Sequence, residues 1–413
     1  MRDTTLPDFD ANEPFDPQPI ALPRVLIVHN RYREPGGEDV VADAQARLLR
    51  EHGHVVHTYE RDNKEINGYS FLGKAALYFR MKNNRASARD MARIVRDFNP
   101  RAAHVHNTLP LISPSIYAPL QREGVKVIQW LHNYRLVCPA GTLFRSGAPC
   151  TLCVDGDFSH AIKYKCWTGS KRATQGLVRM LRYHRHARTW LERVDLFVAL
   201  NSFQKQILVE AGGLPESKVI VQPNFSNAYP YSRTMSAGAG AEFLFAGRLM
   251  PEKGISTLLR ALGLLRDVPI AIAGDGPLRE SVERTCASTG HQYLGQLDRT
   301  ALRERMEWSR ALLFTSEWPE GCPSVILEAL ACGKPVIASS VAGAVELLQE
   351  GKTGLFFPPG NYEALVACVR QLISHQALEE RMNAATHARF VEHHSREAGY
   401  WHLMTLYEKL GIL

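Results

Sequence analysis

The chain lacks any apolar run of the ~18 residues that a helix needs to cross a bilayer, so the sequence predicts no membrane-spanning helix. Residues 1–22 also lack the basic start and apolar centre of a secretory signal peptide. They are acidic and Pro-rich, and we expect them to form a disordered tail. No internal repeat is visible in the chain.

Acidic residues are scarce in one part of the chain. Between Phe71 and Leu200 there are 21 Lys and Arg residues but only 7 Asp and Glu residues, and the formal net charge of the whole chain is +7. This asymmetry indicates an anionic partner. The segment from Lys171 to Val194 interleaves basic and apolar side chains, as a helix lying on an anionic membrane surface does. A core-packed helix with a solvated basic face is the open alternative.

Length and pattern together predict an α/β protein of more than one domain. A chain of 413 residues, 45% apolar and 22% charged, is long enough for two or three globular domains. From Arg24 to Asn224 strand-like and helix-like patterns alternate, which is typical of a doubly wound parallel sheet. The Ser/Gly/Ala-rich residues 231–241 predict an interdomain linker, and a second alternating series begins at Phe243.

The most informative segment is EGCPSVILEALACGKPVIAS, residues 320–339. Pro323 suits the first position of a helix, and Gly333 suits the left-handed residue that follows a helix. Glu320 is therefore predicted on a loop just before the helix and Glu328 inside it, both facing one ligand site. A loop carboxylate can hold sugar hydroxyls or stabilise a positive anomeric centre, and a carboxylate further into the helix can grip a ribose. A solvated pair of glutamates is the alternative for this motif in isolation.

Two further segments point to the binding of a phosphorylated ligand. The strand and loop FLFAGRLMPEKG carry Arg248 and Lys253, two cations that can neutralise a diphosphate. The strand PIAIA then ends in a turn through which the backbone can approach a ligand closely. This predicted turn contains Gly274, Asp275 and Gly276.

In this order, the segments GRLMPEKG, AGDGP and E-x7-E resemble a retaining glycosyltransferase of family 4. The resemblance spans about residues 24–390 and extends to the VHNRYREPGGEDVVADAQARLLREHGH segment. It implies the GT-B fold, an α/β architecture in which two Rossmann-like parallel-sheet domains face a central cleft. The expected N-terminal acceptor domain covers residues 23–230 and the nucleotide-sugar domain covers residues 242–390. Residues 391–413 would form a helix that crosses back to the first domain.

The resemblance also assigns roles to single residues. It implies that Glu320 holds the donor sugar, that Glu328 holds the ribose and that the backbone of Gly321 and Cys322 meets the sugar. Family members often have Gly where this chain has Pro323, which has no N–H to donate. The sugar that is accepted is therefore an open question.

In the N-terminal half, Gly36 and Gly37 follow the first strand and precede a helix. This position allows backbone N–H groups to approach a phosphate or sugar, although a plain turn has the same composition. The resemblance implies that this loop closes over the donor. It also implies that His132, at the end of the strand VIQWLH, is the active-site histidine, with His106 as the second candidate. His29 and His104 compete with them, because they also lie near strand ends.

Half of the eight cysteines fall in one short stretch, with the spacing C-x11-C-x2-C-x12-C. In a chain without a secretion signal, a structural Zn2+ site is favoured over disulfides. The alternative is four unrelated thiols that lie near one another. The proposed ligands are Cys138, Cys150, Cys153 and Cys166. The resemblance includes a subgroup of bacterial surface-polysaccharide enzymes with a similar Cys-rich insertion.

Taken together, the sequence predicts transfer of a hexose-type sugar from a nucleotide diphosphate sugar to a lipid-linked or polysaccharide acceptor in bacterial surface polysaccharide synthesis. No cofactor is expected in catalysis, and no nucleic acid is expected as a partner. The expected location is the cytoplasm, with peripheral binding to the inner face of the cytoplasmic membrane left open. Two alternatives are a GT-B nucleotide-sugar epimerase and a zinc-stapled nucleic-acid-binding protein.

Overall fold

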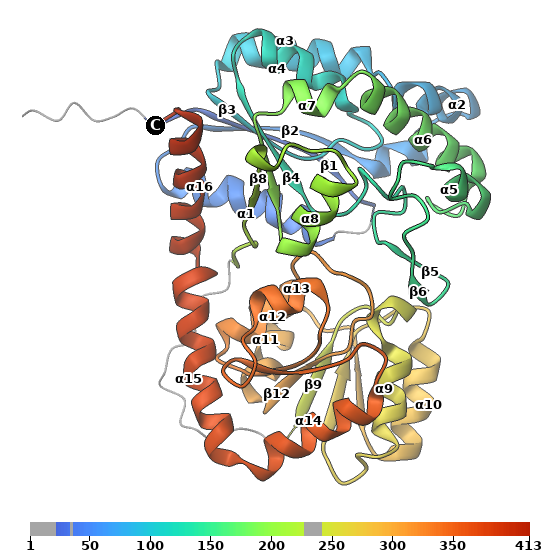
Figure 1. Ribbon diagram of the computed structural model, residues 1–413, viewed down its shortest axis with the longest axis vertical. Coiled ribbons are helices and arrows are strands. Elements are labelled where there is room, and N and C mark those ends of the chain that lie inside the picture. Colours follow the sequence, from blue (N-terminus) through green and yellow to red (C-terminus); the bar gives the residue numbers. More distant parts are fainter. Residues whose placement is uncertain (1–21, 34–35, 227–241) are drawn as a thin grey trace, which may run out of the picture.

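The computed structural model describes residues 22–33, 36–226 and 242–413 of the chain. The predicted linker at residues 231–241 and the predicted tail, except for Leu22, lie outside these residues. Two α/β domains, each built on a six-stranded parallel sheet, lie one above the other in Figure 1. The predicted fold class is thereby confirmed.

The N-terminal sheet has the strand order β2-β1-β3-β4-β7-β8. Its strands are β1 (Val25–Arg31), β2 (Val56–Asp62), β3 (Ala102–Asn107), β4 (Lys126–Leu131), β7 (Leu196–Ala199) and β8 (Val219–Val221). The helices of this part are α1 (Gly37–Glu51), α2 (Phe71–Arg80), α3 (Arg85–Phe98), α4 (Tyr117–Arg122), α5 (Ser159–Tyr164), α6 (Lys171–His186), α7 (Thr189–Arg193) and α8 (Ser202–Glu210). A short antiparallel pair, β5 (Phe144–Arg145) and β6 (Ala148–Pro149), extends from the domain.

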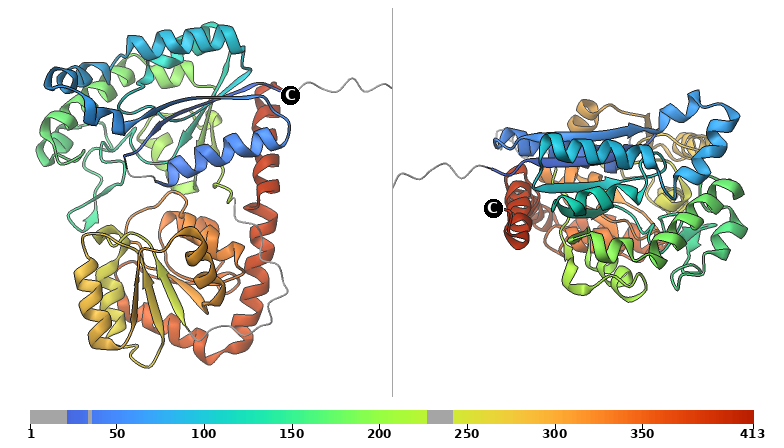
Figure 2. Two further views of the ribbon diagram at one scale, coloured as in Figure 1. Left: turned by 180° about the vertical axis from the view of Figure 1, so that it is seen from behind. Right: turned by 90° about the horizontal axis from the view of Figure 1, so that it is seen from above.

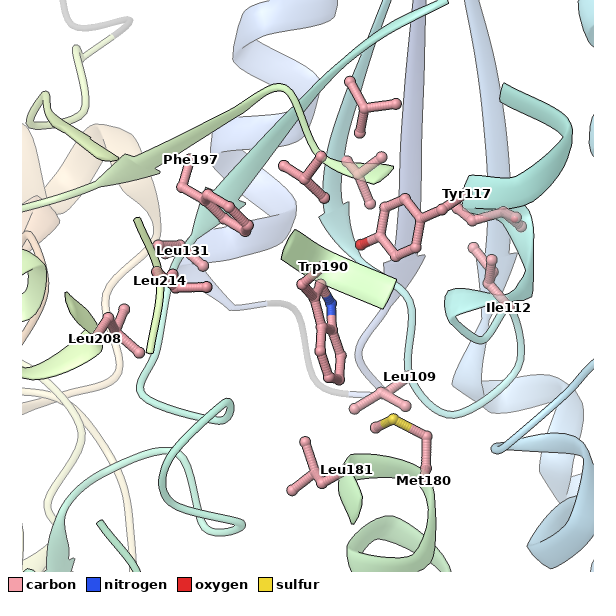
Figure 3. Close-up of a cluster of buried hydrophobic side chains, with 14 of the residues drawn as sticks. Leu109, Ile112, Tyr117, Leu131, Met180, Leu181, Trp190, Phe197, Leu208 and Leu214 are labelled. Atoms are coloured by element: carbon pink, nitrogen blue, oxygen red, sulfur yellow. The ribbon is translucent and has the colours of Figure 1, made fainter. Parts of the chain in front are cut away.

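Helices cover both faces of this sheet, and successive side chains of a strand point to opposite faces. Alternate residues of β1 are therefore buried against different helices. Leu26 and Val28 of β1 pack in a cluster with residues of α3, α4 and α6–α8. Figure 3 shows part of this cluster, including Tyr117, Trp190 and Phe197. Val25 and Ile27 pack on the other face, against α1 and the last helix of the chain.

The C-terminal sheet has the strand order β11-β10-β9-β12-β13-β14. Its strands are β9 (Phe243–Ala246), β10 (Ile270–Ala273), β11 (Gln292–Gly295), β12 (Ala311–Phe314), β13 (Val336–Ser339) and β14 (Gly354–Phe357). The helices are α9 (Ile255–Leu262), α10 (Arg279–Thr289), α11 (Arg299–Trp308), α12 (Ser324–Ala331), α13 (Ala342–Leu347), α14 (Tyr362–Ser374) and α15 (Gln376–His393). These helices cover both faces of the sheet.

The last helix, α16 (Arg396–Leu410), packs on the N-terminal domain. Leu403, Leu406 and Tyr407 are buried among residues of β1, β4, β7 and α1. Figures 1 and 2 show α15 running along the C-terminal domain and α16 continuing upward beside the N-terminal sheet. The chain therefore links its two domains a second time at its C-terminal end.

The basic segment from Lys171 to Val194 is not the single helix that its pattern predicted. It forms α6 and the short α7, with a break at Ala187 and Arg188, where Arg188 has a φ of +50°. The break lets Trp190 turn into the core beneath the sheet. Among the described residues, no helix is both long and apolar enough to cross a membrane.

Candidate functional site

Both sheets reverse their strand order beside their first strand. In the N-terminal sheet β1 lies between β2 and β3, and in the C-terminal sheet β9 lies between β10 and β12. At such a switch point the connections leave in opposite directions, and ligands of open α/β sheets bind beyond the carboxyl ends of the strands. Arg248 and Lys253 follow β9, and Glu320 follows β12. These three predicted residues therefore meet at the switch point of the C-terminal sheet.

The loop after β9 packs closely on the loop after β10. A Cβ atom at Gly274 would lie 1.9 Å from the carbonyl oxygen of Gly247, and one at Gly276 would lie 2.7 Å from that of Leu249. Both glycines also have positive φ angles, +141° and +155°, which L side chains rarely adopt. In the structure, the backbone that approaches these glycines is the loop that carries Arg248.

Lys253 and Glu320, predicted from separate motifs, form an ion pair. Lys253 Nζ lies 2.7 Å from Glu320 Oε1, and both side chains are largely buried. The next residue, Gly254, has a φ of +68°, and a Cβ there would lie 1.8 Å from the carbonyl oxygen of Thr315. The Thr315 hydroxyl donates to the Lys253 carbonyl at 2.8 Å. These contacts fasten the loop after β9 to the loop after β12, whereas the Arg248 side chain is exposed.

The loop after β12 is also held by the N-terminal domain. Asn201 Nδ2 donates to the carbonyl oxygens of Glu320 and Gly321, at 3.1 and 2.7 Å. The Asn201 side chain is fully buried, and its oxygen caps α8 by accepting from Gln204 N. On the other side, a Cβ at Gly343 would lie 2.7 Å from the Glu320 carbonyl oxygen. The position of Glu320 is thus set by both domains.

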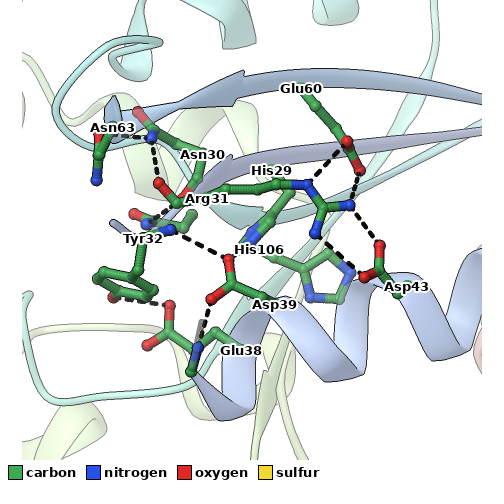
Figure 4. A network of polar contacts seen from close by, with 12 residues as sticks. His29, Asn30, Arg31, Tyr32, Glu38, Asp39, Asp43, Glu60, Asn63 and His106 are labelled. Carbon is green, nitrogen blue, oxygen red and sulfur yellow. Dashed lines mark hydrogen bonds and ion pairs between the residues drawn. The ribbon is translucent and has the colours of Figure 1, made fainter. Parts of the chain in front are cut away.

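The predicted double-glycine loop begins α1, with Gly36 as the residue before the helix. Asp39 accepts from Gly36 N at 2.7 Å and from Tyr32 N at 3.1 Å, and its carboxylate lies 2.7 Å from His29 Nε2 (Figure 4). Burial alone would raise the pKa of Asp39, but these hydrogen bonds outweigh it and lower the pKa. Gly37 has open space around it.

Glu38 joins this loop to the segment that follows β4. Its carboxylate accepts from the Tyr32 hydroxyl at 2.9 Å and from Asn133 Nδ2 at 2.7 Å. Asn133 is next to His132, the predicted active-site histidine, which directly follows the last residue of β4. A hydrogen bond therefore joins the first turn of α1 to the residue that follows His132.

The two candidate histidines contact each other. His106 Nδ1 lies 2.8 Å from His132 Nε2 and the rings are stacked. Burial lowers the pKa of His132 to about 4 and that of His106 well below its usual range, so both rings are neutral at pH 7. The main chain of His132 lies beside Gly321 of the Glu320 loop, because a Cβ atom at Gly321 would lie 3.5 Å from the His132 carbonyl oxygen. By contrast, His104 is a core residue that bonds to Gln45 and Tyr407.

Glu328 lies in the second turn of α12 and is half-buried. Burial raises the pKa of its carboxyl group, and the positive charge of Arg299 opposes this effect. The prediction that Pro323 is the first residue of the helix is wrong by one position. Pro323 directly precedes α12, which begins at Ser324. Burial raises the pKa of the Cys322 thiol to about 12, so this thiol is not activated as a nucleophile.

The four clustered cysteines lie in the N-terminal domain. Cys138, Cys150, Cys153 and Cys166 line a single cavity of about 20 Å³. Burial raises the pKa of Cys153 to about 11, and the three other thiols contribute to the rise. As they stand, no three or more His, Cys, Asp or Glu side chains of the described residues form a set that could hold a metal ion.

Three residues of this region were not predicted from the sequence: Asn201, Glu38 and Gly343. Asn201 closely follows a parallel strand, and Glu38 lies in the first turn after the double glycine. Both positions are common for ligand-site residues. No local signal marks Gly343. A glycine is required there because the residue contacts the Glu320 loop, which precedes β13 in the chain, whereas Gly343 follows β13.

Profiles of two known families match the chain. The family described as Glycosyltransferase Family 4 matches residues 35–227, and that described as Glycosyl transferases group 1 matches residues 236–389. These spans correspond to the two domains of the structure.

Among curated proteins, the glycogen synthase of Mycobacterium tuberculosis is 29% identical over 212 residues, which cover 49% of this chain and 51% of that protein. The phosphatidyl-myo-inositol mannosyltransferase of Mycobacterium leprae is 29% identical over 208 residues, or 48% of this chain and 55% of that protein. The chain thus spans about half the length, or less, of the curated relatives it matches.

Among solved structures, HepE of Anabaena in complex with UDP has a TM-score of 0.64 and 16% sequence identity. The alignment covers 93% of this chain and 100% of that one. The same protein has also been solved with UDP-glucose. At this identity the similarity establishes the fold, which is GT-B.

We predict that Asn201→Asp destabilises the protein. An aspartate keeps the acceptor that caps α8 but loses the two donors to Glu320 and Gly321, which leaves buried carbonyl groups unsatisfied. The free energy of unfolding should fall by about 2–4 kcal/mol, measured by chemical denaturation. Asn361→Asp is the matched control, because Asn361 only caps α14 and is exposed. It should change stability by less than about 0.5 kcal/mol, and equal effects of the two substitutions would contradict the role of Asn201.

Proposed function

The chain carries a family 4-like glycosyltransferase domain followed by a group 1 glycosyltransferase domain, and on this basis we propose that it transfers a sugar from a nucleotide diphosphate donor. The observation that carries the proposal is the Lys253–Glu320 ion pair at the switch point of the C-terminal sheet, with Arg248 exposed on the same loop. A diphosphate beside a sugar needs cations for its oxygens and a carboxylate for the sugar. This site supplies both.

In the proposed reaction, the bond between the anomeric carbon and the diphosphate breaks, and the sugar is joined to the acceptor with its anomeric configuration retained. Negative charge grows on the leaving diphosphate, and Arg248 and Lys253 stabilise it electrostatically. Arg248 and Lys253 supply the compensating positive charge, so the proposed reaction needs no catalytic metal ion. The E-x7-E motif resembles that of retaining family 4 glycosyltransferases, and this resemblance supports retention and a hexose-type donor.

The remaining residues would position the donor. Glu320 holds the sugar, Glu328 holds the ribose and the backbone of Gly321 and Cys322 approaches the sugar ring. From the N-terminal domain, His132 and the loop at Gly36 and Gly37 approach the same ligand. Because burial keeps His132 neutral, it offers a hydrogen bond to a sugar hydroxyl and not a second positive charge.

We propose a lipid-linked or polysaccharide acceptor, received by the N-terminal domain in the synthesis of a bacterial surface polysaccharide. An exposed surface on this domain supports a membrane-bound acceptor. Phe71 and Leu72 of α2 are 78% and 77% exposed, Phe79 is 60% exposed, and α2 has no buried residue. Exposed apolar groups of this size mark interaction surfaces.

Basic side chains lie on the same helix and on its neighbour. The helix α2 packs on the basic helix α6, and the Arg179 guanidinium lies 4.9 Å from the centre of the Phe79 ring. Lys74 and Arg80 lie on α2 itself. Apolar groups framed by cations fit an anionic lipid surface, which they would bind reversibly, with the nucleotide site remaining on the cytoplasmic side.

We predict that Arg248→Ala and Lys253→Ala each slow the transfer of sugar by about 30- to 1000-fold. This range corresponds to about 2–4 kcal/mol of transition-state stabilisation, the size of one lost electrostatic donor. Lys352→Ala, which removes an exposed lysine of the same domain, is the control and should retain activity. The measurement is release of the nucleoside diphosphate from UDP-, GDP- and ADP-sugars. Near-normal turnover in both variants, or epimerised sugar formed without any acceptor, would overturn the assignment.

We predict different kinetic effects for the paired carboxylates. Glu320→Gln removes a charge near the anomeric centre and should lower kcat. Glu328→Gln weakens a ribose grip that serves ground and transition states alike, so it should mainly raise the KM for the donor. Donor titrations of both variants separate these parameters. Small and equal changes in kcat and KM for the two variants would count against a sugar contact by Glu320 and a ribose contact by Glu328.

We predict that the full-length protein sediments with anionic vesicles and that salt weakens this binding, because surface charges are screened. Phe71→Ser combined with Leu72→Ser should reduce vesicle binding at least about tenfold, since each side chain loses apolar burial. The control pair is Leu264→Ser with Trp308→Ser, two exposed apolar residues of the other domain. Equal binding to neutral and anionic vesicles, or equal loss in the control pair, would refute the surface.

A further inference from the structure

The four clustered cysteines approach one another from three separate stretches of chain. Cys138 lies between β4 and β5, Cys150 and Cys153 follow the β5–β6 pair, and Cys166 follows α5. Residues 138–166 are thus folded around the cavity of about 20 Å³ that all four side chains line. The other cavity-lining residues are mainly apolar, among them Leu143 and Ala161. A volume of this size accommodates a single small ion.

Backbone hydrogen bonds hold the main chain at two of these cysteines. Cys150 N donates to the Leu143 carbonyl at 2.7 Å, and Cys166 N donates to the Ala161 carbonyl at 3.0 Å. The pair Cys150 and Cys153 lies on one tight turn, the C-x2-C arrangement in which two sulfurs can reach one ion. The described thiols are free, with no disulfide among them.

A second observation concerns Arg145, which lines the same cavity. Its Nε atom is buried and has no hydrogen-bond partner among the described residues. A buried N–H donor without a partner is costly and calls for an acceptor. Neutral thiols are weak acceptors, whereas thiolates bound to a metal ion are good acceptors for such outer donors. The cavity therefore combines four sulfur ligands with a cation that suits an anionic cluster.

We propose that this cavity binds one structural Zn2+ through the thiolates of Cys138, Cys150, Cys153 and Cys166. Four thiols and one Zn2+ give a four-thiolate complex of net charge −2 and release four protons to solvent, with no change of oxidation state. Arg145 offsets part of this charge. As they stand, the four thiols do not form a metal-binding set among the described residues. Binding would therefore require the sulfurs to move onto the ion by rotation about their Cα–Cβ bonds, which carries a sulfur among staggered positions.

The ion would brace the segment that carries His132. Cys138 N donates to the Tyr134 carbonyl at 2.8 Å, and Tyr134 N donates to the Gly141 carbonyl at 3.0 Å. This turn begins two residues after His132. Loss of the ion should therefore loosen the His132 side of the site, a consequence that rests on the proposed function, whereas ion binding itself does not.

The test is metal analysis of the freshly purified, reduced, full-length protein, which should contain about one Zn2+ per chain. Cys153→Ser should lose most of the metal, whereas Cys368→Ser, a half-buried thiol of the other domain, should retain it. A chelator should lower the melting temperature of the wild-type protein but not that of Cys153→Ser. These readouts do not depend on sugar transfer.

If Cys153→Ser fails to fold, Co2+ titration of the metal-stripped wild-type protein replaces it. Intense thiolate-to-cobalt absorption, abolished by competing Zn2+, would support the site. No metal in the fresh protein together with four freely reactive thiols would overturn the proposal. Disulfides among these cysteines, or iron with acid-labile sulfide, would also overturn it.

Discussion

The segment from Glu320 to Pro323 is held from three sides, and the geometry of the candidate site depends on this constraint. Lys253 pairs with the Glu320 side chain, Asn201 binds the main chain from the other domain, and Gly343 leaves room for the Glu320 carbonyl. The ion pair lies within the C-terminal domain, whereas the Asn201 bonds cross between domains. Separation of the domains would therefore release the backbone of this loop but leave its charge paired. Only the joined domains fix the carboxylate against the N-terminal residues.

The features that could be predicted from the sequence are those determined by residues close together in the chain. The alternation of apolar strands and amphipathic helices follows from burial on both faces of parallel sheets, and it predicted the α/β fold class. Gly333 was expected to adopt the left-handed conformation after α12, and it does so with a φ of +66°. Arg248, Lys253 and Glu320 could be placed at strand ends because parallel strands bring all their carboxyl ends to one edge.

The parts that sequence could not predict depend on residues far apart in the chain. The Lys253–Glu320 pair joins positions 67 residues apart, and the Asn201 bonds to the Glu320 loop span about 120 residues. No Gly or Pro in the sequence marks the break between α6 and α7. At this break Arg188 adopts the left-handed conformation, and Trp190 packs in the core. Packing of α16 on the N-terminal sheet was expected only from the family resemblance, because the apolar face that receives it exists only in the assembled sheet.

The burial of Glu320 limits how Lys253 can serve a phosphate. The Glu320 side chain is 8% exposed, and removing the partner of a buried charge costs on the order of 3–5 kcal/mol. If Lys253 turned wholly to a diphosphate, it would leave Glu320 unpaired, so the proposed function requires a lysine that both anions share when the donor is bound. His132 cannot supply the missing charge at pH 7, because burial lowers its pKa to about 4. In the proposed reaction, Arg248, exposed on the same loop, would be the cation free to follow the leaving diphosphate, while Lys253 would act on it from its pair with Glu320.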